Sequence, residues 1–125
     1  MISTLIPEEI YSIPRLGTLA VHDSLLPAYR GFAPLNWAIL KGETQTGVTL
    51  FKLSKEMDAG DIVKQRVVEI GADDTADIVY ERICKATCDV VAEALIEIKA
   101  GESSSSPQTE SMATYTCARN PKDGL

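Results

Sequence analysis

A long helix is the feature of this sequence that most restricts its fold. Between residue 75 and about residue 99, apolar side chains recur near helical spacing: they are Ile78, Val79, Ile83, Val90, Val91, Leu95 and Ile98. Asp73 or Asp74 is placed to cap the start of this helix, and Gly101 is placed to end it. The Ser-rich stretch that follows, over residues 102–110, predicts a solvated connection.

Segments rich in Val, Ile and Thr precede the helix. We expect strands at residues 18–22, 46–53 and 62–70, and a further short strand at residues 112–117. Pro34 suits the first turn of a short helix that Gly42 ends, and residues 6–13 fit a short helical or turn segment. Strands separated by helices favour an α/β sheet.

Size and charge exclude several classes of protein. A chain of 125 residues fits one domain with a real core. Its net charge of -6 disfavours nucleic-acid binding, which needs Lys and Arg to neutralise phosphates. No apolar run approaches the ~20 residues of a membrane span and no signal peptide is visible, so we expect a cytoplasmic protein. The three cysteines are expected to be small buried thiols without a disulfide scaffold.

Nothing ahead of the first predicted strand reads as a nucleotide-type α/β half. We therefore expect an incomplete sheet, and an unpaired sheet edge needs cover or pairing. A homodimer, or a partner chain that supplies the missing N-terminal half, would satisfy that edge.

Two residues, far apart in the sequence, are candidates for chemistry. His22 ends the first predicted strand, and the carboxyl ends of strands in open α/β sheets face the ligand crevice. A histidine exchanges protons near neutral pH, although a lone histidine is more often structural. Asp58 lies in a charged turn and is either a solvated charge or a carboxylate that orients a histidine. The spacing alone does not bring the two residues together.

Two motifs, in this order, resemble the family that uses 10-formyltetrahydrofolate to formylate amines. Residues 22–31 read HDSLLPAYRG, and residues 57–62 read MDAGDI, with TGVT at residues 46–49 between them. Gln108 and Tyr115 fit the family's later pattern less specifically. The resemblance spans residues 6–124 and implies a partial Rossmann-like formyltransferase fold, with a mixed sheet, flanking helices and the N-terminal half missing. Residues 1–125 would then be the C-terminal portion of the catalytic domain.

The resemblance implies an Asn-x-His motif and an aspartate as the catalytic set. His22 and Asp58 match the histidine and the aspartate, but the asparagine position falls on Ala20. Residues 20 and 22 of a strand point to the same face, so an asparagine there would aim its amide beside the imidazole. Loss of one oxyanion donor typically costs about 10²–10³ in rate. An engineered inactive form, a natural weak enzyme and a non-enzyme are all compatible with Ala20.

The resemblance also implies the ligands. The formyl donor would be 10-formyltetrahydrofolate. Asp58 would bind it, and Leu25, Leu26 and Pro27 would form one wall of the pterin pocket. The alternative interpretation of these three apolar residues is ordinary core packing. No metal is required.

Residues 32–38, FAPLNWA, are most similar to the sugar-nucleotide N-formyltransferases. The implied substrate is a dTDP- or UDP-linked amino sugar, with Arg30 as partner of an anionic substrate group and Trp37 as a wall. Arg30 reads otherwise as a solvated charge, and Trp37 as helix core. The alternative functions are an inactive formyltransferase-like binding or interaction domain and a methionyl-tRNA formyltransferase fragment.

Overall fold

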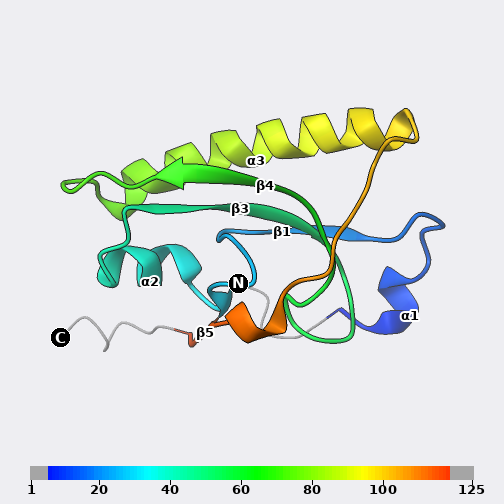
Figure 1. Ribbon diagram of the computed structural model, residues 1–125, viewed down its shortest axis with the longest axis horizontal. Coiled ribbons are helices and arrows are strands. Elements are labelled where there is room, and N and C mark those ends of the chain that lie inside the picture. Colours follow the sequence, from blue (N-terminus) through cyan, green and yellow to red (C-terminus); the bar gives the residue numbers. More distant parts are fainter. Residues whose placement is uncertain (1–5, 119–125) are drawn as a thin grey trace.

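One long helix lies across a three-stranded sheet in the computed structural model, which describes residues 6–118 (Figure 1). The helices are α1 (Glu8–Tyr11), α2 (Pro34–Leu40), α3 (Ala76–Lys99) and the short 3₁₀ helix η1 (Glu110–Met112). The strands are β1 (Leu19–His22), β2 (Arg30–Gly31), β3 (Gln45–Lys52), β4 (Ile62–Glu69) and β5 (Tyr115–Thr116). In Figure 1, α3 covers one face of the sheet, and the chain after α3 crosses to the other side, where η1 and β5 lie.

The larger sheet has the order β1-β3-β4, and both pairings are antiparallel. Its register places His22 opposite Thr49 and Ala20 opposite Phe51. Strands β2 and β5 form a second, parallel pair although 85 positions separate Arg30 from its partner Tyr115. The described chain is thus an α/β protein whose C-terminal segment returns to a loop near its start.

The core lies between α3 and the sheet. Val79, Ile83, Ala86, Val90 and Ala94 are the buried residues of α3, and their spacing keeps them on one face. They pack against Val48 and Leu50 of the central strand β3 and against Val68 of β4. Burying one Val, Ile or Leu side chain stabilises a fold by roughly 1.5–3 kcal/mol, so this layer supplies much of the stability of the sheet.

The expected elements are present, with small shifts at their ends. The short helix spans the predicted residues, and Gly42 and Gly101 follow helices with positive φ values of 72° and 74°. The cap of α3 differs from the prediction, because Thr75 accepts a hydrogen bond from the Ile78 N–H. The Asp74 carboxylate is already used by the Gly71 N–H and by Arg82.

One expectation is corrected. All three cysteines, Cys84, Cys88 and Cys117, are exposed free thiols, because the first two lie on α3 outside its buried stripe. Residues 102–110 are largely exposed, as a solvated connection requires. Two contacts also hold them to the fold: Ser106 pairs with Ile62 of β4, and Gln108 accepts a hydrogen bond from buried Arg30. Among residues 6–118, no helix is both long and apolar enough to cross a membrane.

The packing of α3 predicts a contrast between two isoleucines on the same helix. Ile83 is 2% exposed and Ile96 is 70% exposed. Ile83→Ala should lower the free energy of unfolding by roughly 2–5 kcal/mol because it removes buried contacts and leaves a cavity. Ile96→Ala, the matched control, should change it by less than about 0.5 kcal/mol. Urea denaturation followed by circular dichroism measures both values, and equal losses would contradict the described core.

Candidate active site

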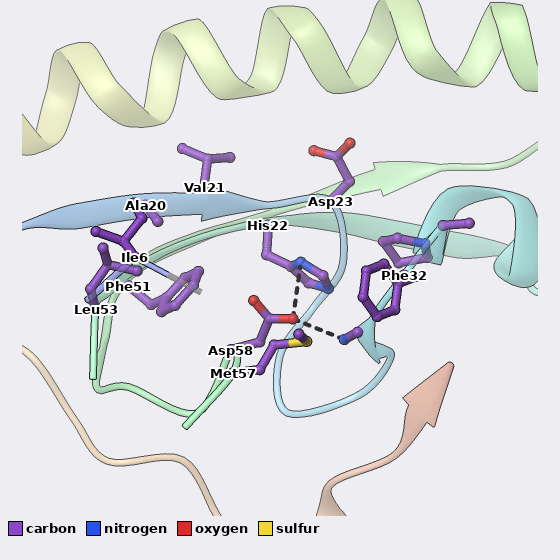
Figure 2. Close-up of a pocket in the computed structure, with 13 residues that line it drawn as sticks. Ile6, Ala20, Val21, His22, Asp23, Phe32, Phe51, Leu53, Met57 and Asp58 are labelled. Atoms are coloured by element: carbon purple, nitrogen blue, oxygen red, sulfur yellow. Dashed lines mark hydrogen bonds and ion pairs between the residues drawn. The ribbon is translucent and has the colours of Figure 1, made fainter. Parts of the chain in front are cut away.

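His22 ends β1 and points to the face of the sheet opposite α3 (Figure 2). Its side chain is buried, and Nε2 lies 2.7 Å from the backbone oxygen of Tyr29. A backbone carbonyl only accepts hydrogen bonds, so Nε2 must carry the proton of the neutral ring. Nδ1 is therefore the ring atom that is able to accept a proton from a ligand.

Asp58 faces this nitrogen. It lies in the loop between β3 and β4, and this loop runs beneath the sheet to reach the histidine (Figure 2). Oδ2 of Asp58 is 3.7 Å from Nδ1 of His22 and accepts a 2.8 Å hydrogen bond from the Gly31 N–H. The first distance exceeds that of a direct hydrogen bond, but a proton taken up at Nδ1 would face the carboxylate.

The loop that presents Asp58 has an unusual backbone. Asp58 has a φ of 54°, a left-handed conformation that costs a non-glycine residue roughly 1–2 kcal/mol. Gly60 packs directly on the Lys52 carbonyl, where a Cβ atom would collide. The Gln108 amide group donates to the backbone oxygens of Asp58 and Gly60, at 2.8 and 2.7 Å. These contacts offset the cost of the turn.

Arg30 lies behind the site, fully buried. Its guanidinium makes five hydrogen bonds: two to Gln108 Oε1, two to the Glu110 carboxylate and one to the Tyr115 hydroxyl. The hydrogen bond to Glu110 raises the pKa of Arg30, and the same bond lowers the pKa of Glu110. The arginine thus fixes the C-terminal segment to the loop that carries the Gly31 N–H.

A cavity of about 350 Å³ opens beside the histidine and the aspartate. It is within the range of small-molecule sites, roughly 300–1,000 Å³. Asp23 contributes a third polar group, and burial raises its pKa while a positive charge on neighbouring His22 opposes that rise. The apolar lining residues include Ile6, Ala20, Phe51, Leu53 and Met57. The polar side chains of this cavity therefore lie against an apolar wall that includes the Ala20 methyl group.

Comparison with known families decides the relationship. The sequence model of the family described as formyl transferase matches residues 2–95, three quarters of the chain. The chain belongs to the formyl transferase family.

Solved structures of similar proteins agree with this membership. WlaRD, a sugar 3N-formyl transferase crystallised with dTDP and 5-N-formyl-THF, is 28% identical over 84% of this chain, with a TM-score of 0.75. PseJ from Anoxybacillus kamchatkensis, in complex with UDP-4,6-dideoxy-4-formamido-L-AltNAc and tetrahydrofolate, is 27% identical over 96%, with a TM-score of 0.80. HypX from Aquifex aeolicus, in complex with tetrahydrofolic acid, is 29% identical over 97%, with a TM-score of 0.82.

This formyl transferase chain matches only part of each of those proteins. It spans 37% of WlaRD, 61% of PseJ and 21% of HypX. Its α/β architecture therefore corresponds to a portion of the formyltransferase fold.

The structure brings together three of the predicted site residues. Ala20, His22 and Asp58 all line the cavity, and β1 places the first two on one face, as the strand period requires. Spacing within the sequence gave no reason for Asp58 to approach His22, and the expectation rested on family resemblance alone.

The other predicted site residues lie away from this cavity. Leu26 is buried, Leu25 packs on Gly47, and neither they nor Pro27 line the cavity. The Trp37 indole donates to the backbone oxygen of Cys117.

The expectation for Arg30 is corrected, because each of its five N–H groups already has a protein partner in the described chain. Sequence reasoning missed the Tyr29 carbonyl and the Gly31 N–H because backbone contacts leave no residue-type signal.

The buried guanidinium predicts that charge alone does not suffice at position 30. Arg30→Lys keeps the charge but cannot match a planar set of five donors. It should cost roughly 1–3 kcal/mol of unfolding free energy, because buried acceptors lose their partners. Arg82→Lys, at a partly exposed pair with Asp74, should cost below ~1 kcal/mol. Thermal unfolding of both variants measures the difference, and an unchanged Arg30→Lys protein would contradict this account.

Proposed function

We propose that this chain belongs to an enzyme that transfers a formyl group from 10-formyltetrahydrofolate to the amine of a nucleotide-linked amino sugar. The observation that carries the proposal is the approach of His22 Nδ1 to the Asp58 carboxylate, 3.7 Å away, at a cavity in a formyl transferase chain. A base with one free nitrogen and an adjacent carboxylate suits a reaction in which a proton leaves an amine.

The residues of the cavity fit a formyl-folate donor. Its volume of about 350 Å³ is near the lower end for small-molecule sites, so it would hold the reacting end of such a ligand. Apolar side chains and the His22–Asp58 pair suit a ligand that has both an aromatic ring and a reactive carbonyl. Folates bound to WlaRD, PseJ and HypX support this donor class. The donor supplies the formyl carbon.

The roles of the side chains follow from their geometry. The substrate amine forms the new bond to the formyl carbon, the bond from that carbon to the folate nitrogen breaks, and a proton moves from the amine to that nitrogen. Nδ1 of His22 accepts this proton from the amine and then releases it to the folate nitrogen, because Nε2 is engaged by the Tyr29 carbonyl. Asp58 stabilises the resulting imidazolium, and its own orientation is fixed by the Gly31 N–H.

Ala20 limits the rate in this proposal. The oxygen of the formyl group becomes negatively charged during attack, and preorganised donors stabilise such a charge. The side chain at position 20 lines the same cavity as His22 but carries no donor. The expected deficit is about 10²–10³ in rate relative to an asparagine at this position.

The amino-sugar substrate class rests on two of the similar structures. WlaRD is described as a sugar 3N-formyl transferase with dTDP, and PseJ is bound to a UDP-linked formamido sugar. The net charge of -6 also disfavours a large nucleic-acid substrate.

An inactive binding domain is the second candidate, and Ala20 is the observation that favours it. Such a domain would still bind a folate or a nucleotide sugar, but no substitution at position 20 alone would create turnover. The two candidates therefore differ in the outcome of a single substitution.

The decisive variant is Ala20→Asn. We expect it to raise formylation of a dTDP- or UDP-linked amino sugar by about 10²–10³, since the amide adds one donor beside the imidazole. Mass spectrometry of the sugar product after incubation with 10-formyltetrahydrofolate measures the rate. The double variant Ala20→Asn, His22→Asn is the control and should lose the gain. If Ala20→Asn binds both ligands and gains no activity, the proposed mechanism is wrong.

A further inference from the structure

We propose that Gln108, held by Arg30, is the positioning residue for Asp58. This inference rests on the proposed function, in which Asp58 stabilises the protonated His22. Gln108 does not line the cavity, and 50 positions separate it from Asp58. Its side chain nevertheless fixes the backbone of the loop that carries the carboxylate.

The first step is the contact between Gln108 and the loop. A single amide nitrogen, Nε2, donates to the backbone oxygens of Asp58 and Gly60 at 2.8 and 2.7 Å. One of these carbonyls belongs to Asp58 itself, whose φ is a left-handed 54°, and the other belongs to Gly60, two residues later. Strained conformations of this kind persist only where surrounding contacts determine them. The Gln108 amide makes two such contacts, at Asp58 itself and two residues after it.

The second step is the orientation of the amide. Oxygen and nitrogen of a glutamine side chain are told apart by their partners. Arg30 has only donors, so the Gln108 atom that it contacts, at 3.0 and 2.8 Å, must be the oxygen. The nitrogen must then face the carbonyls of the loop. Arg30 cannot rotate away, because the Glu110 carboxylate and the Tyr115 hydroxyl hold its remaining N–H groups.

The third step is that both contacts that hold Asp58 depend on strand β2. Its carboxylate is held by the Gly31 N–H, and its backbone is held by Gln108, which Arg30 fixes. Arg30 and Gly31 are the two residues of β2, which pairs with β5. A loss of Gln108 therefore releases the backbone of the loop while the carboxylate keeps one bond, and the distance between carboxylate and imidazole changes.

Nuclear magnetic resonance of the 125-residue chain tests this without an activity assay. His22 is the only histidine of the sequence, so its ring signals report directly on the site. The amide proton of Gly31 reports on the Asp58 carboxylate, to which it donates. The test compares Gln108→Leu with Asp58→Asn. Gln65→Leu is the matched control: the Gln65 amide also donates twice, to the backbone oxygen of Leu26 and to the Thr49 hydroxyl opposite His22, but it does not contact the loop of Asp58.

We expect Gln108→Leu to shift the His22 ring signals and the Gly31 amide proton in the direction of Asp58→Asn, by at least half as much. Gln65→Leu should leave both near their original positions. Gln108→Glu, which keeps an oxygen partner for Arg30 but places a second oxygen against the two carbonyls, should shift both signals as Gln108→Leu does. If Gln108→Leu fails to fold, the signals of Gln108→Glu test the positioning role instead.

Unchanged signals in a folded Gln108 variant would overturn the positioning role. An equal shift in Gln65→Leu would also overturn it, since the effect would then be general loosening. A different failure is recognisable: if Asp58→Asn leaves the His22 ring signals unmoved, the imidazole–carboxylate pairing of the proposed function is wrong. The role of Gln108 is then judged by the Gly31 amide proton alone.

Discussion

A buried positive charge holds this site together. The Arg30 side chain is fully buried, and its partners Gln108, Glu110 and Tyr115 all come from the C-terminal segment. An unpaired buried charge costs several kcal/mol, so the loop around Arg30 requires the C-terminal segment in its docked position. The same docking brings Gln108 to the loop of Asp58. The candidate catalytic pair is therefore built from segments near the start, the middle and the end of the described chain.

Local patterns predicted the main layer of the fold. The apolar stripe of α3 buries one face of that helix, so its period appears in the sequence. Strand β3 is buried along six consecutive residues, so it appears instead as a continuous run rich in apolar and β-branched residues. The pairing of β2 with β5 could not be predicted in this way. Each of these strands has only two residues, and their alignment depends on the contacts of Arg30 with a segment some 80 positions away. Long-range hydrogen bonds of this kind leave no periodic signal.

The site was predictable to a smaller degree. His22 drew attention as the last residue of a strand, whereas Asp58 was indicated only by the resemblance to formyltransferases. The structure places the two side chains on the same side of the sheet, with Nδ1 of the imidazole facing the carboxylate. Arg30 shows the limit of reasoning from residue type. An arginine in a polar loop reads as a ligand for an anion, but this side chain is buried and makes five hydrogen bonds to three residues of the protein.

The contact between the indole of Trp37 and the backbone of Cys117 has a practical consequence. Trp37 is the only tryptophan of the sequence, and it lies on α2, while Cys117 follows β5 in the segment that docks on Arg30. Indole emission depends on the polarity of its surroundings. The tryptophan fluorescence of this protein therefore changes when the C-terminal segment leaves its docked position. The fluorescence of Trp37 thus reports on the same docking of the C-terminal segment that assembles the proposed catalytic pair.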